Sequence, residues 1–292
     1  MRVAGVLSML LVVSSLGAQE VPRAIYTDPP HDAKHPARLE VLHVPSGGVA
    51  INGVAYVAAG AGMHPTFVFL HGLPGNEKNL DLAQAVRRDG WNAVTVNYRG
   101  SWGSPGSFRF AQNLEDARAV LAYLRDSANA RALGVDTSRI VLAGHSMGGW
   151  VAAVTAADDA RLLGVVLISA ADLGVVRTLP RADVVARMKE SMESLAGGTA
   201  ESFADDLIAL PADLSFASAA RGLTRTPLLV LTSDDGLAPH SDSLVAAIRR
   251  QGSTAVKTMH AVTDHSWSDR RIALESAVLR WLQRLPRREG TR

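Results

Sequence analysis

Short apolar runs alternate with amphipathic stretches along most of this chain. The runs typical of buried strands are 66–70, 93–97, 140–143, 163–169, 227–231 and 255–260. The stretches with helical periodicity are 80–89, 114–126, 147–157, 242–251 and 270–285. Two further predicted strands, 39–44 and 49–57, are separated by a Pro-Ser-Gly-Gly turn. This order predicts an α/β protein with a mostly parallel eight-stranded sheet and helices on both faces.

One interval, residues 171–226, breaks the alternation because it separates two predicted strands by far more than a usual crossover. It contains two amphipathic helical patterns, 183–195 and 200–210, and Pro211 stops the second one. We expect a small helical lid or cap inserted in the main domain. The alternative is a long helical crossover that packs on the edge of the sheet.

The N-terminus has the three parts of a secretory signal peptide. A Met-Arg pair supplies a short positive region, residues 3–13 are mostly apolar, and small residues precede an expected cleavage point near Ala18. The apolar run is too short to span a membrane. We therefore expect residues 1–18 to be removed and the protein to be secreted or periplasmic, with no stable membrane span after cleavage. The alternative is an N-terminal membrane anchor that stays on.

Composition narrows the class of protein. Hydrophobic residues make up 47% of the chain and charged residues 20%, which is typical of a globular domain, here 38–292, after an irregular, proline-containing lead-in at 19–37. The net charge is +2 and the basic residues are scattered, so we expect no nucleic-acid partner. Cysteine is absent, which excludes disulfides, thiolate metal sites and a cysteine nucleophile. The His-Asp-Ala-Lys-His run at 31–35 is expected to be a solvated loop.

Ser146 is the candidate nucleophile. It lies in Gly-His-Ser-Met-Gly-Gly at 144–149, directly after the apolar run 140–143. A strand that runs into Gly-x-Ser-x-Gly predicts a nucleophile elbow, in which the serine backbone is strained and its neighbours must lack bulk. Gly144 and Gly148 meet this demand.

A serine hydroxyl needs a base, and in this strand order the base should follow the last strand. His265 lies in the polar run Thr-Asp-His-Ser-Trp at 263–267, between the last strand and the last helix, and is our candidate. His260 falls within the last predicted strand, where its apolar neighbours suggest packing. His240 lies at a helix start, where capping or surface exposure explains it.

The acid that orients the base should follow a late strand. Asp234 and Asp235 both come directly after the run 228–231, and their spacing does not separate them. Asp264 is a weaker candidate because a residue beside the histidine rarely points at it. Asp172, just after an earlier strand, is another possible anchor for the acid.

Two backbone N–H groups should hold the oxyanion of the tetrahedral intermediate. Met147 follows the nucleophile at the start of its helix and is expected to supply one. Leu73, in the His-Gly-Leu-Pro-Gly loop at 71–75, is expected to supply the other, because Pro74 has no N–H. The place of His71 argues for bracing this loop rather than for catalysis.

Together these segments resemble the α/β-hydrolase superfamily, over nearly all of the chain after residue 38. The motifs that carry the resemblance are His-Gly-Leu-Pro-Gly at 71–75, Gly-His-Ser-Met-Gly-Gly at 144–149, Asp-Asp-Gly-Leu-Ala-Pro at 234–239 and Asp-His-Ser at 264–266. The resemblance implies the α/β-hydrolase fold. It also favours Asp235 over Asp234, because the acid of the family usually stands four residues before a proline, here Pro239. A serine nucleophile argues against the dehalogenases and epoxide hydrolases of this fold.

The run Asn-Tyr-Arg-Gly-Ser-Trp-Gly-Ser-Pro-Gly at 97–106 looks like the Arg-Gly loop of serine aminopeptidase-like and prolyl oligopeptidase-like members of the superfamily. Within it, Trp102 is expected either to line the substrate pocket or to pack against neighbouring side chains. No phosphate loop or dinucleotide fingerprint occurs, and we expect the chemistry to need neither a cofactor nor a metal.

The sequence thus predicts a serine hydrolase that cleaves carboxylic esters with Ser146, His265 and Asp235. The fold and triad do not choose between ester and amide, so a peptidase acting on short peptides is the alternative. Such a peptidase needs carboxylates for a substrate ammonium, and the candidates are Glu190, Glu193, Glu201, Asp205 and Asp206. A solvated helix face also explains these residues. A non-catalytic binding protein on a hydrolase scaffold is a third, weaker hypothesis.

Overall fold

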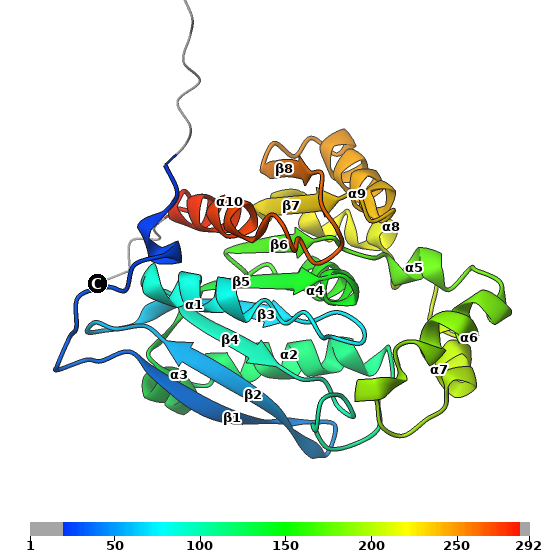
Figure 1. The fold of residues 1–292 in the computed structure, drawn as a ribbon, viewed down its shortest axis with the longest axis horizontal. Coiled ribbons are helices and arrows are strands. Elements are labelled where there is room, and N and C mark those ends of the chain that lie inside the picture. Colours follow the sequence, from blue (N-terminus) through cyan, green and yellow to red (C-terminus); the bar gives the residue numbers. More distant parts are fainter. Residues whose placement is uncertain (1–19, 287–292) are drawn as a thin grey trace, which may run out of the picture.

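Eight strands form one sheet in the computed structural model, which describes residues 20–286 (Figure 1). The strands are β1 (Arg38–Ser46), β2 (Val49–Val57), β3 (His64–Leu70), β4 (Asn92–Val96), β5 (Val135–His145), β6 (Gly164–Ile168), β7 (Leu228–Ser233) and β8 (Val256–Ala261). Their order in the sheet is β1-β2-β4-β3-β5-β6-β7-β8. The pairs β1–β2 and β2–β4 are antiparallel and the others are parallel. The predicted fold, a mostly parallel eight-stranded sheet, is confirmed.

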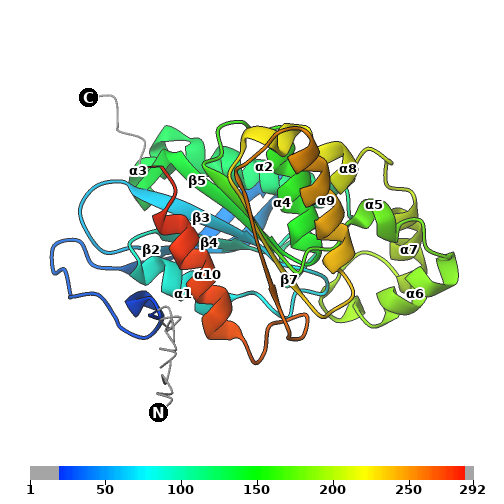
Figure 2. The ribbon, with the colours of Figure 1, turned by 90° about the horizontal axis from the view of Figure 1, so that it is seen from above.

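Helices cover both faces of the sheet, as Figure 2 shows from above. They are α1 (Leu80–Arg88), α2 (Gln112–Arg125), α3 (Ser127–Leu133), α4 (Met147–Ala157), α9 (Ala238–Arg250) and α10 (Arg271–Gln283). Side chains of β3 alternate between the two faces: Phe67 and Phe69 pack with α1 and α10, whereas Val68 and Leu70 pack with α2 and α4. The four residues at the end of the strand, 67–70, are all hydrophobic because both faces of the strand are buried there.

Helix α3 was not predicted from the sequence. It is one of the shorter helices, and Asp126 begins it by accepting hydrogen bonds from the Ala128 and Asn129 N–H groups. Gly134, with φ 65°, ends it in the left-handed region. An Asp followed eight residues later by Gly is the signal that could have found this helix.

The segment 171–226, called the cap segment below, lies at the carboxyl edge of the parallel strands (Figure 1). It contains α5 (Leu173–Val176), α6 (Arg181–Lys189), α7 (Ala200–Ile208) and α8 (Phe216–Ala219), with short 3₁₀ turns at Met192–Ser194 and Gly222–Arg225. Helices α6 and α7 pack on each other, whereas α8 packs on α4 and α9 of the main body. One part of the segment therefore projects from the sheet and the other part covers it.

The helix predicted at 183–195 ends earlier, at Lys189. The residues that follow the 3₁₀ turn are paired with the loop after β4 instead. Trp102 N–H donates to Ser194 O (3.0 Å), Ala196 N–H donates to Gly100 O (2.8 Å), and Phe108 N–H donates to Ala196 O (2.9 Å). These long-range backbone bonds compete with the helix, and the local sequence pattern carries no sign of them.

The lead-in is pinned to the body at residues 23–25, a 3₁₀ turn in which Ala24 is buried. The Arg88 side chain donates hydrogen bonds to the carbonyls of Ala24 and Ile25. The predicted signal peptide at 1–18 lies outside the described residues. Within residues 20–286, no helix is long and apolar enough to cross a membrane.

A buried ion pair fixes the loop after β4. The fully buried Asp116 of α2 accepts hydrogen bonds from the Arg99 N–H (2.9 Å) and the Arg99 Nε (2.7 Å). Ser46, at the end of β1, donates to the same carboxylate. Because all three donors converge on one buried charge, the loop that begins at Arg99 has a defined path.

Removing that charge should be costly. The Arg99 guanidinium also forms an ion pair with the exposed Glu115 carboxylate. We expect Asp116→Ala to lower the free energy of unfolding by about 3 kcal/mol, because Arg99 would lose its buried partner and keep only the exposed one. Urea denaturation followed by circular dichroism measures the loss. Asp158→Ala, which breaks the exposed ion pair between Arg118 of the same helix α2 and Asp158 at the end of α4, is the control and should leave the midpoint nearly unchanged. Equal losses in the two variants would contradict the argument.

Candidate active site

Ser146 lies in the tight turn between β5 and α4. Its backbone has φ 56° and ψ −122°, a region that residues other than glycine rarely adopt. Three backbone hydrogen bonds hold the turn: Ser146 N–H donates to Ile168 O (3.0 Å), and Ser146 O accepts from Gly149 N–H (2.9 Å) and Ala171 N–H (3.1 Å). The Gly-x-Ser-x-Gly pattern therefore lies on the strand–turn–helix geometry of a nucleophile elbow.

The glycines around Ser146 let three backbones approach one another. A Cβ at Gly144 would lie 2.0 Å from Gly148 O, and one at Gly148 would lie 2.1 Å from Leu70 O. A Cβ at Gly72 would lie 2.8 Å from the Ser146 Cβ. Any side chain at these positions would collide, so the loop after β3 reaches the serine only because glycine is present.

His265 and Asp235 are brought together by the loops after β8 and β7. His265 Nδ1 donates a hydrogen bond to Asp235 Oδ2 at 2.7 Å. The Asp235 side chain is 4% exposed, whereas that of His265 is 38% exposed. Burial alone would raise the pKa of Asp235, but hydrogen bonds from His265 and the Leu237 N–H lower it to about 2. Asp235 is therefore ionised at neutral pH.

The other three candidate acids have different partners. Asp234 bonds to His260 Nε2 (3.0 Å) at the surface. Asp264 accepts from the Ser268 N–H (2.8 Å) within its own loop. Asp172 accepts from the Gly174 and Phe216 N–H groups and begins α5. Among the four candidate carboxylates, only Asp235 forms a hydrogen bond with the His265 side chain.

The two remaining candidate histidines take structural partners. His260 was expected to pack, but it is exposed and bonds to Thr232 Oγ1 (3.0 Å) and Asp234. The reason is that β8 is an edge strand, on which alternate side chains face solvent. His240 Nδ1 accepts a hydrogen bond from the Asp172 N–H (3.1 Å) and so connects α9 to the cap segment.

His145, to which the sequence analysis assigned no role, contacts His265 directly. Its Nε2 donates to the backbone carbonyl of His265 (2.9 Å), and the two ring centroids are 4.6 Å apart. Burial, and then the neighbouring charge of His265, lower the pKa of His145 to about 3. His145 is therefore a neutral donor that holds the His265 backbone.

Leu73 and Met147, the expected oxyanion donors, lie on the two segments that meet at Ser146. Met147 is the first residue of α4. The carbonyl of Pro74, next to Leu73, accepts from the Trp102 indole N–H (2.6 Å) and from the Ser194 hydroxyl (2.8 Å). The loop of Leu73 is thus fixed by the loop after β4 and by the cap segment together.

The base of the same loop is braced by His71. Its buried ring donates through Nδ1 to Gly72 O (2.8 Å) and packs against the Tyr98 ring, 4.7 Å between centroids. Burial lowers the pKa of His71 to about 4, so the ring is neutral. This position agrees with a bracing role.

Arg271, which no sequence pattern singled out, joins the loop of His265 to the loop of Leu73. Its guanidinium donates to Ser266 O (2.9 Å), to Asn79 Oδ1 (3.0 Å) and to both carboxylate oxygens of Asp81. Arginine suits this place because its planar fork reaches several acceptors at once.

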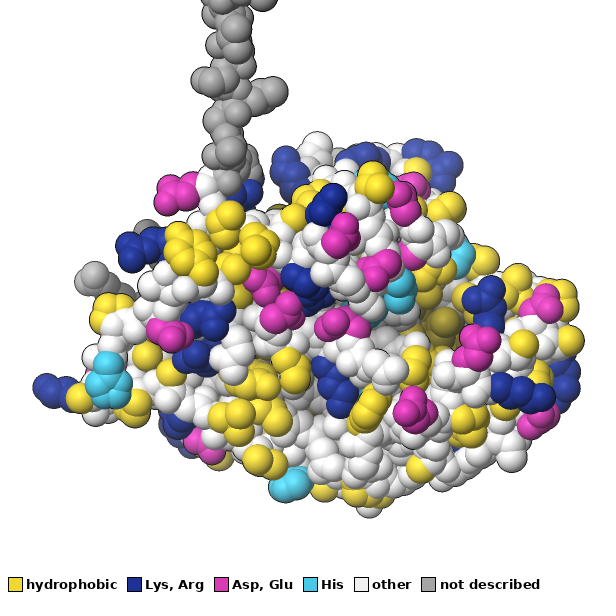
Figure 3. Space-filling model, in the orientation of Figure 1, with side chains coloured by type: hydrophobic (Ala, Val, Ile, Leu, Met, Phe, Trp, Pro, Cys, Tyr) yellow, Lys and Arg dark blue, Asp and Glu magenta, His cyan; other side chains and the backbone are white. Residues whose placement is uncertain are grey.

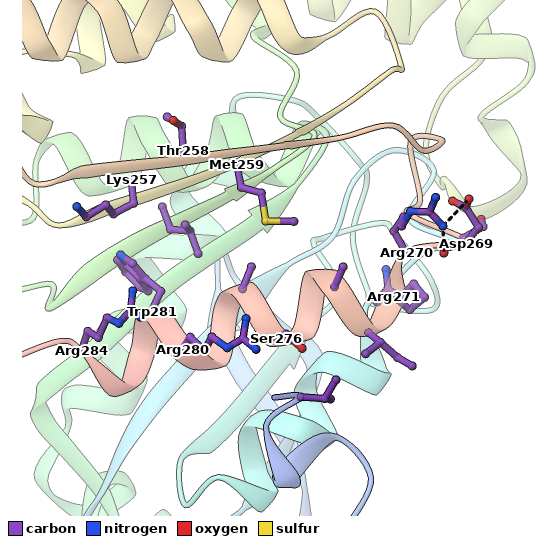
Figure 4. A pocket seen from close by; sticks show the side chains of 16 residues that line it. Lys257, Thr258, Met259, Asp269, Arg270, Arg271, Ser276, Arg280, Trp281 and Arg284 are labelled. Atoms are coloured by element: carbon purple, nitrogen blue, oxygen red, sulfur yellow. Dashed lines mark hydrogen bonds and ion pairs between the residues drawn. The ribbon is translucent and has the colours of Figure 1, made fainter. Parts of the chain in front are cut away.

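A separate cavity of about 830 Å³ lies between β8 and α10 (Figure 4). Lys257, Arg280, Arg284 and Trp281 are among the residues around it. None of Ser146, Asp235 and His265 lines this cavity, so it is distinct from the site described above.

Known proteins share both the sequence pattern and the fold. A model of the alpha/beta hydrolase family matches residues 67–287. The chain belongs to this family. The match includes the elbow at Ser146 and the loops that carry Asp235 and His265.

Two curated relatives of the hydrolase match over part of their length. The quorum-quenching protein AidA of Acinetobacter baumannii (strain MDR-ZJ06) is 33% identical over 108 residues, which cover 35% of this chain and 34% of that protein. The multifunctional-autoprocessing repeats-in-toxin protein of Vibrio vulnificus is 28% identical over 192 residues, 63% of this chain and 3% of that protein. The matches thus span about a third or less of either relative.

Solved structures of similar fold include two with informative names. The Pyrobaculum calidifontis esterase has a TM-score of 0.60 at 23% identity, covering 86% of this chain and 85% of that chain. The Pyrococcus horikoshii acylaminoacyl peptidase has a TM-score of 0.65 at 16% identity, covering 88% of this chain and 43% of that chain. At these identities the likeness shows the fold alone.

Within residues 20–286, no group of three or more His, Cys, Asp or Glu side chains is arranged to hold a metal ion.

The neutral state of His145 predicts a pH dependence of stability. Its pKa is about 3 in the folded protein against 6.5 in a free chain, so the unfolded state binds the extra proton. Stability should therefore fall as pH drops from about 6.5 towards 3. We expect His145→Gln to reduce this slope by up to about 1.4 kcal/mol per pH unit, measured by urea denaturation from pH 4 to 7. Parallel curves for the two proteins would show that His145 does not carry the effect.

Proposed function

We propose that the protein is a serine hydrolase that cleaves carboxylic esters through an acyl-serine intermediate. The observation that carries the proposal is the hydrogen bond from His265 Nδ1 to the buried, ionised Asp235. It leaves Nε2 of the neutral ring as the proton acceptor. This histidine belongs to a loop whose backbone is held by His145, the residue next to Ser146.

The proposed reaction uses each part of the site. His265 Nε2 takes the proton from the Ser146 hydroxyl as its oxygen attacks the ester carbonyl, and Asp235 stabilises the imidazolium. The N–H groups of Leu73 and Met147 hold the oxyanion. His265 gives the proton to the departing alkoxide, which leaves an acyl-serine. A water molecule, deprotonated by His265, then attacks the acyl-serine and releases the acid and the free serine.

An ester substrate is favoured over a peptide with a free amino terminus because three of the five candidate carboxylates of the cap segment have other partners. The Glu201 carboxylate lies 4.0 Å from the Lys189 ammonium. Asp205 forms two hydrogen bonds with Arg181, and Asp206 accepts from the Phe110 N–H. Figure 3 shows acidic and basic side chains intermixed on the face that it presents. The esterase among the similar structures supports this choice, whereas the acylaminoacyl peptidase keeps amide substrates as the second candidate.

Replacing the nucleophile tests the proposal. We expect Ser146→Ala to lose about 10⁴-fold or more of kcat/KM on p-nitrophenyl esters of increasing acyl length, because the remaining groups cannot form the acyl-enzyme. Ser241→Ala, which removes a buried hydroxyl without a partner in the described residues, is the matched control. A fluorophosphonate should label the wild type and not Ser146→Ala.

Other outcomes have definite meanings. Turnover of aminoacyl anilides without turnover of esters would favour the peptidase. A folded wild type that neither turns over any of these substrates nor reacts with the fluorophosphonate would overturn the proposal and favour a binding protein.

We also propose that the enzyme is secreted or periplasmic, on the strength of the signal-peptide pattern at residues 1–18. In a secreting bacterial host, the mature protein should begin at or next to Gln19. N-terminal sequencing of the protein from the periplasm or medium checks this. A cytoplasmic protein that still begins at residue 1 or 2 would contradict it.

A further inference from the structure

The loop of Leu73, which follows β3, is held in place by side chains from other segments. Within residues 20–286, no backbone N–H or C=O of residues 73–78 forms a hydrogen bond with another backbone group. Pro74 has no N–H to donate at all. The loop nevertheless lies close to the nucleophile, because a Cβ at Gly72 would be 3.4 Å from Ser146 Oγ. Its path near the serine therefore depends on side-chain contacts.

The carbonyl of Pro74 is the point at which two distant segments contact this loop. It accepts hydrogen bonds from the Trp102 indole N–H (2.6 Å) and from the Ser194 hydroxyl (2.8 Å). A carbonyl oxygen has two lone pairs, so these two donors use its full capacity. Trp102, in the loop after β4, is 28 residues from Pro74 in the sequence, and Ser194, in the cap segment, is 120 residues from it. The two segments together fix this peptide.

Trp102 is itself fixed by several neighbours. Its backbone N–H donates to Ser194 O (3.0 Å), and its backbone carbonyl accepts from Asn97 Nδ2 (3.2 Å). The Lys78 ammonium lies 4.3 Å from the centroid of the Trp102 ring and donates to Asn97 Oδ1 (3.2 Å). Because Lys78 belongs to the loop of Leu73, that loop contacts the indole at two points.

The backbone of Trp102 is strained. Its φ is 49°, in the left-handed region that bulky residues avoid. Such a conformation costs free energy and persists where the surroundings over-determine it, which happens most often at functional sites. A tryptophan that only filled space in this loop would not need that conformation.

The Ser194 hydroxyl also has a less demanding alternative that it does not use. Ser191, three residues earlier in the cap segment, donates to the carbonyl of Arg187 one helical turn before it (3.1 Å). Ser194 and Trp102 are both half-buried, so water can reach the edge of their site. Both side chains instead donate to one oxygen, that of the residue next to Leu73.

We propose that Trp102 and Ser194 are positioning residues that hold the Pro74 carbonyl and thereby keep the Leu73 N–H directed at the oxyanion. The proposal rests on the proposed serine hydrolase function. An oxyanion donor lowers the barrier only when it already lies where the oxygen of the tetrahedral intermediate will be. Through Ser194, the cap segment takes part in this preorganisation.

Two substitutions each remove one donor to Pro74 O. Trp102→Phe keeps an aromatic ring beside Lys78 but removes the N–H, and Ser194→Ala removes the hydroxyl. We expect kcat on a p-nitrophenyl ester to fall about tenfold in Trp102→Phe and about 3–10-fold in Ser194→Ala, with KM changed less than about twofold. The effect falls on kcat because the oxyanion exists only in the transition state and the tetrahedral intermediate. Rates are referred to the concentration of sites that a fluorophosphonate labels.

A transition-state analogue distinguishes positioning from general destabilisation. The carbonyl carbon of an aryl trifluoromethyl ketone bonds to Ser146 Oγ, the hydroxyl proton passes to His265 Nε2, and the carbonyl oxygen becomes an oxyanion. The inhibition constant of this ketone should rise in each variant by the same factor by which kcat/KM falls. A merely structural role of Trp102 and Ser194 would not produce this proportionality.

Matched controls come from the same chain. Trp150→Phe removes an indole N–H that donates to a backbone carbonyl elsewhere, Leu214 O (2.8 Å), and Ser191→Ala removes a cap hydroxyl that bonds within its own helix. Both controls should keep kcat within about twofold of the wild type. Ser194→Thr retains the hydroxyl and should recover most of the activity that Ser194→Ala loses. Should Trp102→Phe fail to fold by circular dichroism, the Ser194 pair of variants is read alone.

The possible outcomes separate this proposal from the function on which it rests. Wild-type kcat in Ser194→Ala and in folded Trp102→Phe, with activity still lost in Ser146→Ala, would overturn the positioning role and leave the hydrolase intact. A lower kcat without a matching rise in the inhibition constant would also overturn it, because the loss would then not arise at the oxyanion. Activity that survives in Ser146→Ala would overturn the proposed function itself.

Discussion

The close approach of three backbones at Ser146 is the constraint on which this site depends. Gly148 lies against the carbonyl of Leu70, Gly144 lies against Gly148, and Gly72 lies against the Ser146 side chain. A methyl group at Gly72 or Gly148 would push β3 and the loop after it away from the turn after β5, and one at Gly144 would distort the turn itself. Because the expected oxyanion donors Leu73 and Met147 belong to the two segments in contact, their distance from the serine is set by these glycines. The absence of side chains at these three glycines therefore sets the geometry on which the proposed catalysis depends.

Electrostatics then divides the ionisable groups around the turn into two kinds. His71 and His145 are buried without a carboxylate partner, and burial keeps both rings neutral. Asp235 is buried with several donors, and these keep it charged. His265 alone is partly exposed and faces that charge. The proposed base therefore lies between one neutral ring, that of His145, and one fixed anion, Asp235.

Much of this arrangement could be predicted from the sequence because it depends on residues that are close together along the chain. The order of strands and helices follows from periodicity, and the expected positions of Ser146 and His265 follow from strand–turn–helix and strand–loop–helix contexts. The spacing alone did not separate Asp234 from Asp235, since adjacent residues in one loop differ only in where the loop turns them. Helix α3 and the early end of α6 were missed because the first is short and the second is ended by backbone bonds to a distant loop.

The groups that support the site were not predictable in the same way, for a physical reason. Each of these residues forms a hydrogen bond with a partner 64 to 192 residues away in the sequence, so no local window contains both ends of that bond. They are His145, Arg271 and the buried residues Trp267, Ser169 and Ser233, which are hydrogen-bonded in that order. Their residue types are also ordinary for a protein core or surface. What distinguishes them is the free energy that their arrangement costs. Two of them, Ser169 and Trp267, have positive φ angles, as Ser146 has. Buried polar atoms are also unfavourable unless they are hydrogen-bonded. Strained backbone and buried hydrogen bonds are concentrated around one partly exposed histidine, His265. Folding alone does not require that concentration. The supporting groups therefore favour the proposed chemistry on physical grounds that the motifs alone do not provide.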